Sequence, residues 1–340
     1  MEGATFRETS VGKHGGPATK PSVFVTRRWP AAVESGLLDH FDVTLNEDDI
    51  PLSQNALKDA FQNHDAVFTT ATDKIDRGVL SGEAIRARLI GNFGVGFNNI
   101  DTETAASLGI AVTNTPDVLT DATADLALAL ILAVARRIGE GERHLRDGAW
   151  TGWRPTHMMG RQVTGKTLGI IGYGRIGQAT ARRAHHGFGM PIKVYSRSAV
   201  DQAVLADTQA EQVGSLEDLL AGSDFVSLHC PASAATRHLI NTERLGHMKP
   251  DAFLINTGRG ELVDEKALIA ALDARTIAGA GLDVFEEEPR VPPGLLNRSD
   301  VVLLPHLGSA TLETREAMGF RVLENAAAFF AGQEPLDRVA

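Results

Sequence analysis

The 340-residue chain contains a single cysteine, Cys230, and no long hydrophobic run. One cysteine excludes an intrachain disulfide framework and is typical of a reducing compartment, so we expect a cytoplasmic protein. The longest purely apolar run, residues 126–135, is too short to cross a bilayer, which argues against membrane association. Residues 1–20 lack the apolar core of a secretory signal, and we interpret them as a disordered N-terminal extension.

An excess of positive charge is also absent. The formal net charge is −10, which argues against general binding to nucleic acid or to anionic membranes, although it leaves room for a local basic pocket. The eleven histidines are scattered, and His185 and His186 are expected on a helix surface. The sequence therefore predicts no metal site.

Short apolar segments alternate with amphipathic ones from residue 21 onward, which is typical of an α/β fold with parallel sheets. The expected strands before the middle of the chain are 22–25, 43–44, 66–69, 89–92 and 111–113. Those after it are 193–195, 225–229, 252–256, 278–282 and 301–304. The number of strands on either side of residue 170 indicates two sheets, and hence two domains.

A glycine-rich turn, GYGRIG, follows an apolar strand at 167–171 near the middle of the chain, and a helix is expected at 178–187. This arrangement is the fingerprint of a Rossmann dinucleotide site. Glycine allows the tight turn, close approach of the phosphates and close packing of the helix, whose N-terminus favours an anion. The predicted cofactor-binding residues of the turn are Gly172, Gly174, Arg175, Ile176 and Gly177.

No acidic residue follows the next strand, at 192–195, where an NAD site needs a carboxylate for the ribose hydroxyls. The chain has Ser196, Arg197 and Ser198 instead. A carboxylate would repel a 2′-phosphate, whereas a guanidinium and two hydroxyls can bind one. The sequence favours NADPH, with NAD kept open; the alternative is an ordinary solvated turn.

A long helix is expected over residues 117–148, with Thr120 and Asp121 as caps at its start. Its first half is apolar nearly all round, so we expect it to be buried between domains or across a homodimer interface. The alternative is a central helix of one large core. A last helix, at 311–331, is free to return to the first domain.

Polar residues stand at or just beyond the ends of three apolar strands in the second half: Arg259 in NTGRG, Asp283 and Glu288 in LDVFEEEP, and His306 in PHLGSAT. The carboxyl ends of parallel strands meet at the ligand-binding edge of a sheet. Arg259 offers a fork for a carboxylate, and His306 next to Glu288 is a candidate proton donor. Taken singly, each could be a solvated loop residue.

Together with HCP at 229–231, these motifs and their order resemble the D-isomer-specific 2-hydroxyacid dehydrogenases over nearly all of residues 68–330. The resemblance implies a catalytic triad of Arg259, Glu288 and His306. It also implies cofactor contacts from Pro231, Thr257, Asp283 and Gly308. Residues 91–101 resemble the family's substrate loop, in which the backbone N–H groups of Val95 and Gly96 would bind a carboxylate.

The branch that resembles the chain most is that of the glyoxylate/hydroxypyruvate reductases, through residues 114–126 and GAWTGWRP at 148–155. In that branch a tryptophan reaches the neighbouring subunit's site, and Trp153 is the matching residue. The alternative for Trp153 is an interface or core residue that does not touch substrate.

The resemblance implies a Rossmann-type doubly wound domain (119–306) inserted into a flavodoxin-like substrate domain (21–118 and 307–340), with hinges at 115–117 and 304–306. The expected activity is NADPH-dependent reduction of a small 2-oxoacid by a homodimer. The alternatives are another D-2-hydroxyacid dehydrogenase, of the 2-ketogluconate, phosphoglycerate or phenylpyruvate type, and a non-catalytic NAD(P)-sensing protein like the corepressors of this fold.

Overall fold

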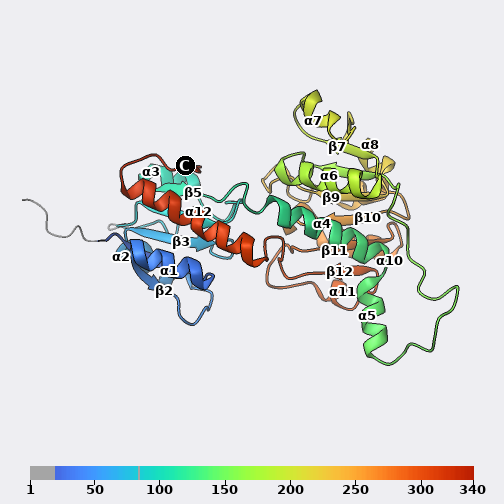
Figure 1. The fold of residues 1–340 in the computed structure, drawn as a ribbon, viewed down its shortest axis with the longest axis horizontal. Helices are drawn as coiled ribbons and strands as arrows, with labels where there is room; N and C mark the ends of the chain where they lie inside the picture. The colour runs from blue at the N-terminus through green and yellow to red at the C-terminus, as the bar shows by residue number, and fades with distance from the viewer. Residues whose placement is uncertain (1–19, 83–84) are drawn as a thin grey trace, which may run out of the picture.

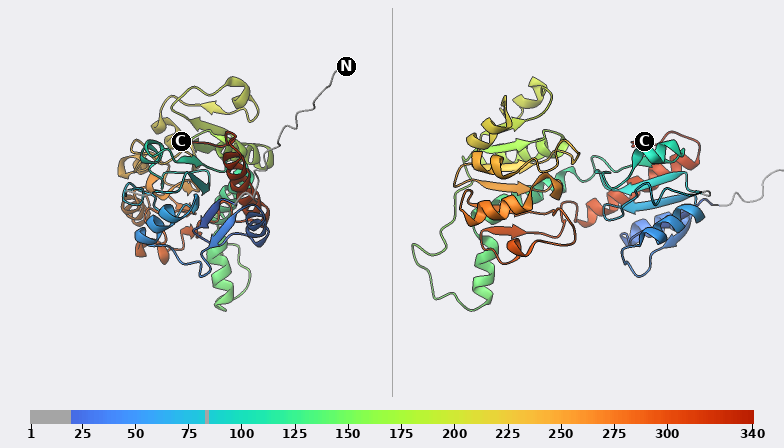
Figure 2. Two further views of the ribbon diagram at one scale, coloured as in Figure 1. Left: turned by 90° about the vertical axis from the view of Figure 1, so that its left-hand side faces the viewer. Right: turned by 180° about the vertical axis from the view of Figure 1, so that it is seen from behind.

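The computed structural model describes residues 20–82 and 85–340, and contains two parallel sheets side by side, each covered by helices (Figures 1 and 2). The extension predicted at residues 1–20 lies outside the described residues, apart from Lys20. The two-domain α/β class expected from the sequence is confirmed.

The first sheet has five parallel strands in the order β2-β1-β3-β4-β5. They are β1 (Ser22–Val25), β2 (Asp42–Leu45), β3 (Ala66–Thr70), β4 (Leu89–Phe93) and β5 (Ala111–Thr113). One face is covered by α1 (Ala31–His40) and α12 (Leu312–Phe330), and the other by α2 (Gln54–Asn63) and α3 (Thr102–Ser107). All five strands lie within two residues of their expected bounds.

The second sheet has seven parallel strands in the order β12-β11-β10-β9-β6-β7-β8. They are β6 (Leu168–Ile171), β7 (Ile192–Tyr195), β8 (Glu211–Gln212), β9 (Phe225–Leu228), β10 (Phe253–Asn256), β11 (Gly279–Leu282) and β12 (Val301–Leu303). The order reverses direction at β6, which is the topological switch point where doubly wound sheets bind their ligands. The two-residue strand β8 was not predicted.

Helices pack on both faces of the second sheet. On one face lie α4 (Thr120–Ala135), α6 (Arg175–Phe188) and α7 (Gln202–Ala206), and on the other α8 (Leu216–Gly222), α9 (Thr242–His247) and α10 (Glu265–Asp273). The remaining helices are α5 (Ile138–Arg146), α11 (Pro293–Leu296) and the short 3-10 helix η1 (Gly260–Leu262).

The chain crosses between the two sheets twice, through residues 114–119 before α4 and through residues 304–311 before α12. Helix α12 then packs against α1 and β4 of the first sheet, as expected for the last helix (Figure 1). Asp117 and His306 lie in these crossings and have left-handed backbone conformations, with φ of +69° and +56°. The strands of the first sheet come from the N-terminal part of the chain, and one of the helices that cover it comes from the C-terminal part.

The single helix predicted over residues 117–148 is wrong, because the structure divides it into α4 and α5 at Arg137, whose φ is +55°. The predicted caps are wrong as well. Leu119 occupies the N-cap position without a side-chain hydrogen bond, and Asp121 pairs with Arg183 of α6 at 2.9 Å instead. Helix α4 is apolar because it packs on α6, β10 and β11, whereas α5 buries none of its side chains and projects from the domain.

The helix after the glycine turn begins three residues earlier than predicted, at Arg175 instead of residue 178. Arg175, Ile176 and Gly177 therefore form its first turn, where backbone N–H groups have no partner within the helix. This shift brings the turn residues themselves to the anion-binding end of the helix.

Candidate active site

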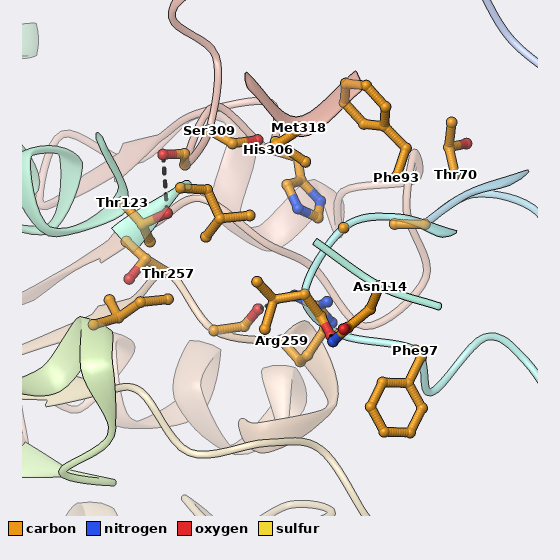
Figure 3. A pocket seen from close by; sticks show the side chains of 18 of the residues that line it. Thr70, Phe93, Phe97, Asn114, Thr123, Thr257, Arg259, His306, Ser309 and Met318 are labelled. Atoms are coloured by element: carbon orange, nitrogen blue, oxygen red, sulfur yellow. Dashed lines mark hydrogen bonds between the residues drawn. The ribbon is translucent and has the colours of Figure 1, made fainter. Parts of the chain in front are cut away.

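A cleft of about 970 Å³ lies between the two domains, at the carboxyl ends of strands from both sheets (Figure 3). Twelve of the residues predicted for the site line it: Val95, Gly96, Gly174, Arg175, Ile176, Pro231, Thr257, Arg259, Asp283, Glu288, His306 and Gly308. Both crossings between the domains contribute to its wall. The cleft therefore brings together residues that are more than two hundred positions apart in the sequence.

His306 and Glu288 form a hydrogen-bonded pair in this cleft. His306 Nδ1 lies 2.8 Å from Glu288 Oε2, and the other carboxylate oxygen accepts the N–H of Phe285 at 3.1 Å. Burial opposes ionisation of Glu288, but the hydrogen bond and charge of His306, the Phe285 N–H and Arg259 outweigh it and lower the pKa of this carboxyl. An ionised Glu288 accepts the Nδ1 proton and leaves Nε2 of the imidazole free for a substrate.

Asp283 holds the turn that carries His306. Its carboxylate accepts the N–H groups of Leu307 at 2.7 Å and Gly308 at 2.8 Å, and its carbonyl accepts the N–H of His306 at 2.9 Å. Burial raises the pKa of Asp283, although the two N–H groups and His306 oppose that shift. Thr123 of α4 completes the turn by donating to the Gly308 carbonyl at 3.1 Å. These bonds fix His306 in its left-handed conformation.

Arg259 follows β10 and reaches across the cleft to the first domain. Its guanidinium donates to the Gly258 carbonyl at 2.8 Å and to Asn98 Oδ1 at 3.2 Å. Burial lowers the pKa of Arg259 against the opposing charges of Glu288 and Glu261, and the group stays a cation at neutral pH. A Cβ on Gly96 would overlap Arg259 Nη2, so the glycine backbone and the guanidinium lie in direct contact.

His229 is a second histidine in the cleft, but burial lowers its pKa to about 4. Its Nε2 lies 2.9 Å from the hydroxyl of Ser227. An imidazole with this pKa is neutral at pH 7 and lacks the imidazolium proton that a general acid gives. Of the two cleft histidines, His306 is therefore the better candidate for a proton donor.

The glycine turn has the geometry of a phosphate site. Gly172 has a φ of +93° and backs onto the Cys230 backbone, and Gly177 packs against the Gly172 carbonyl, so a side chain at either position would clash. Gly174 is the N-cap of α6, no side chain caps this end, and the space around it is open. The first N–H groups of α6 are thus available to an anion.

Ser196, Arg197 and Ser198 begin where β7 ends, beside the glycine turn, because the Gly172 N–H donates to the Tyr195 carbonyl at 3.0 Å. They lie outside the lining of the cleft. Arg197 is exposed and its guanidinium has no hydrogen-bond or ion-pair partner among the described residues. On the other side of the turn, Thr257 Oγ1 is buried without a hydrogen-bond partner within the same residues (Figure 3). These polar groups and the open helix end fit a dinucleotide.

Arg175 is engaged in the structure by an ion pair with Asp117, 2.5 Å apart, which links the start of α6 to the first crossing. Both side chains are more than half exposed. A pair this exposed contributes little to stability, so the guanidinium can turn toward a phosphate at small cost.

Trp153 does not reach the cleft of its own chain. It lies in the segment between α5 and β6, which extends away from both sheets (Figures 1 and 2), and its side chain is 81% exposed. The structure therefore separates Trp153 from the other predicted substrate residues.

Several cleft residues were not predicted, among them Trp29 after β1, and Arg315 and Met318 of α12, whereas Phe93 at the end of β4 belongs to the predicted substrate loop. Arg315 lies over the Phe93 ring, 5.9 Å from its centroid. The sequence indicated that α12 returns to the first domain, but carried no signal for which of its faces meets the cleft.

Among residues 20–82 and 85–340, the His, Cys, Asp and Glu side chains form no group of three that could hold a metal ion. Within the same part of the chain, no helix combines the length and the apolarity that crossing a membrane requires.

The sequence and the structure were compared with those of known proteins, and the matches agree on one family. The protein-family model described as the NAD binding domain of D-isomer specific 2-hydroxyacid dehydrogenases matches residues 128–308. The glyoxylate reductase of Thermococcus litoralis is 48% identical over 93% of this chain and 96% of its own length, and that of Pyrococcus furiosus is 46% identical over 93% and 94%.

Among solved structures, the NADPH-dependent glyoxylate/hydroxypyruvate reductase of Sinorhizobium meliloti in complex with NADP and malonate has a TM-score of 0.84. It is 35% identical, with 95% of this chain and 97% of that chain covered. The TT0316 protein of Thermus thermophilus has a TM-score of 0.86 and 40% identity, covering 94% and 100%. With the cleft and its histidine–glutamate pair, these matches establish that the chain belongs to the D-isomer specific 2-hydroxyacid dehydrogenase family and is an NAD(P)-dependent enzyme.

Proposed function

We propose that this enzyme reduces small 2-oxoacids with NADPH, converting glyoxylate to glycolate and hydroxypyruvate to D-glycerate. The observation that carries the proposal is the meeting, in one interdomain cleft, of a half-buried guanidinium, a glycine backbone in contact with it, and a histidine–glutamate pair. The relatives named as glyoxylate reductases support the choice of substrate.

Arg259 and the backbone of Val95 and Gly96 would bind the substrate carboxylate. A guanidinium forms two parallel hydrogen bonds to a carboxylate, and backbone N–H groups in a glycine-rich bend add donors without bulk. Because Gly96 lies against the Arg259 guanidinium, both sets of donors face the same small volume. Arg259 is also placed to polarise the C2 carbonyl.

When bound, the nicotinamide of the cofactor would supply the hydride that C2 takes up. His306 would donate the proton that the C2 oxygen then needs, from Nε2, while Glu288 holds Nδ1 and stabilises the protonated imidazole. Asp283 keeps the histidine turn in place through Leu307 and Gly308. In the reverse reaction the same histidine accepts the proton.

The cofactor preference for NADPH rests on the residues after β7. Arg197, Ser196 and Ser198 provide a cation and hydroxyls next to the glycine turn, with no carboxylate to repel a 2′-phosphate. The similar reductase from Sinorhizobium meliloti is described as NADPH-dependent. Pro231, Thr257 and the first turn of α6 would hold the rest of the dinucleotide.

We place the domain boundaries at residues 118/119 and 306/307, with 21–118 and 307–340 as the substrate-binding domain and 119–306 as the dinucleotide-binding domain. Residues 115–117 and 304–306 would act as hinges that close the cleft on the substrate. These two segments lie where the chain crosses between the sheets, which supports this assignment.

We further propose a homodimer in which Trp153 enters the partner's cleft. Of the large apolar side chains that are exposed in the described structure, five fall within residues 138–159: Ile138, Leu145, Trp150, Trp153 and Met159. So many exposed apolar side chains in one projecting segment favour a protein–protein contact. A second copy of the chain would cover them.

The proposal is tested by NADPH oxidation with a panel of 2-oxoacids: glyoxylate, hydroxypyruvate, phenylpyruvate, 2-ketogluconate and 3-phosphohydroxypyruvate. We expect the highest kcat/KM with glyoxylate or hydroxypyruvate, and a lower value with NADH. A clear preference for one of the larger acids would favour another branch of the family. Binding of NADPH without turnover of any acid would favour a nucleotide sensor.

A further inference from the structure

The substrate loop that follows β4 has an unusual distribution of hydrogen bonds. Among the described residues, the backbone N–H groups of Val95, Gly96, Phe97 and Asn98 donate to no acceptor. Val95, Gly96 and Phe97 line the cleft. Free N–H groups in sequence are suited to an anion, but only if something keeps them turned toward it.

The carbonyls of Gly94, Val95 and Gly96 in the same loop, by contrast, are all occupied, and two asparagine side chains donate to them. Asn92 Nδ2 donates to the carbonyls of Gly94 at 3.1 Å and Gly96 at 3.0 Å, and Asn114 Nδ2 donates to that of Val95 at 2.9 Å. The Thr115 N–H adds a second bond to Gly94, at 3.1 Å. We call Asn92 and Asn114 the amide clamp.

A trans peptide unit points its carbonyl and its N–H in opposite directions. Fixing the carbonyls of Gly94, Val95 and Gly96 toward the first domain therefore turns the N–H groups of Val95, Gly96 and Phe97 away from it, toward the cleft. We propose that the amide clamp consists of positioning residues, which orient the loop N–H groups for the substrate carboxylate.

Asn92 and Asn114 are themselves firmly held. Asn92 is fully buried and does not line the cleft, so it acts only through the loop. If the Asn92 amide were turned round, its oxygen would face two carbonyl oxygens, so only the orientation with Nδ2 toward them is favourable. In this orientation Oδ1 is buried and has no hydrogen-bond partner among the described residues. Asn114 is tied through its own backbone to Asp337, at 3.1 Å, and to Asn325 of α12, at 3.4 Å.

The cost of that unpartnered oxygen supports a functional role. An apolar side chain of similar size would avoid the cost but would release two loop carbonyls. The clamp also comes from two neighbouring strands, since Asn92 is the penultimate residue of β4 and Asn114 follows β5. The loop is thus attached to the rigid part of the sheet.

The inference rests on the proposed function, and Asn92→Asp tests it. The substitution keeps the shape of the side chain but sets a carboxylate oxygen against two carbonyls. We expect KM for glyoxylate to rise about ten- to a hundredfold, the range for losing a hydrogen bond to a charged group, with a smaller change in kcat. The Kd of NADPH should stay the same, because the clamp does not touch the glycine turn.

Asn46→Asp is the matched control. Asn46 Nδ2 also donates to two carbonyls of the first domain, those of Thr26 at 2.8 Å and Ile50 at 2.7 Å. Asn46 and both carbonyls lie outside the substrate loop and outside the lining of the cleft. Asn46→Asp should therefore lower the melting temperature, while KM stays within about twofold of the parent value.

Binding of oxalate to the NADPH complex, measured by calorimetry, separates the clamp from the chemistry. If the parent protein reduces no 2-oxoacid, the proposed function fails, yet weaker oxalate binding by Asn92→Asp than by Asn46→Asp still supports the clamp. Equal KM and oxalate affinity in parent and Asn92→Asp would overturn it, as would an equal loss in the control. Asn114→Ala, which releases only the Val95 carbonyl, gives the same test should Asn92→Asp fail to fold.

Discussion

Single contacts in the cleft leave little room for substitution, and the contact between Gly96 and Arg259 shows this directly. In the proposed function both groups bind the same carboxylate, which requires the loop backbone to approach the guanidinium without a side chain between them. The chemistry of the site thus depends on an absent Cβ as much as on the charged residues around it.

Gly96→Ala should therefore impair substrate binding. The new methyl group would displace the Arg259 guanidinium, and a displacement of about 1 Å in such a site can cost up to about a hundredfold in rate. We expect a higher KM for glyoxylate with an unchanged Kd for NADPH. Gly187→Ala in α6, where a Cβ meets nothing within 4 Å, is the control and should leave both constants as they are.

Glu288 should make the folded state sensitive to acid. Its pKa is lowered by folding, so its stabilising contribution is present above the ordinary carboxyl pKa of about 4.3 and is lost as the pH falls through the lower folded value. The free energy of unfolding of the parent should exceed that of Glu288→Gln at neutral pH, and the difference should shrink in acid. Denaturant titrations at several pH values measure this, and a constant difference would contradict it.

Sequence patterns identified the polar residues of the cleft better than they identified which residues contact one another there. Arg259, Glu288 and His306 stand at or just beyond strand ends, and parallel topology brings such positions to one edge, so their convergence could be predicted. The packing of Gly96 on Arg259 and the hydrogen bonds from Asn92 to the loop carbonyls depend on the directions in which the side chains point. No spacing in the sequence encodes those directions.

Elements were predicted well where their hydrophobic pattern is set by burial on both faces, as in the strands of the two sheets. The region between residues 117 and 148 was harder. Arg137 breaks the helix there without the proline or glycine that usually marks a break, because α4 is held by tertiary packing and α5 is not. The end of α4 is thus determined by tertiary packing, which cannot be deduced from the helix propensities of the residues.

The end of β7 gives a test at the scale of an element. Ser196→Asp combined with Arg197→Ala places an acid where a ribose hydroxyl would bind and removes the cation expected to hold a 2′-phosphate. We expect the ratio of kcat/KM for NADPH over NADH to fall about ten- to a hundredfold. Steady-state kinetics with both cofactors measures it, and an unchanged ratio would refute this account of the ribose pocket.

At the scale of the whole molecule, the central position of the glycine turn already indicated an inserted dinucleotide domain, and the sheet orders agree with it. The exact domain boundaries, the hinges and the cytoplasmic location stay predictions. The motif identified the projecting segment that carries Trp153. It could not show that Trp153 lies away from the cleft of its own chain, because that depends on the direction in which α5 points.

The dimer can be tested through this segment. Trp153→Ala should lower kcat/KM for glyoxylate if the side chain enters the partner's cleft, while light scattering still reports a dimer. Trp150→Ala is the control, since this neighbouring tryptophan is also exposed, at 53%, but is not expected in a cleft. A monomeric parent protein would contradict both the dimer and the role of Trp153.

The central claim is that this fold transfers hydride to a 2-oxoacid with His306 as the acid. The most direct measurement is NADPH oxidation by glyoxylate at saturating cofactor, for the parent enzyme and for His306→Asn. We predict turnover by the parent and a rate about 100- to 10,000-fold lower in the variant, with an unchanged Kd for NADPH. A variant that turns over as fast as the parent, or a parent that consumes no NADPH, would contradict the claim.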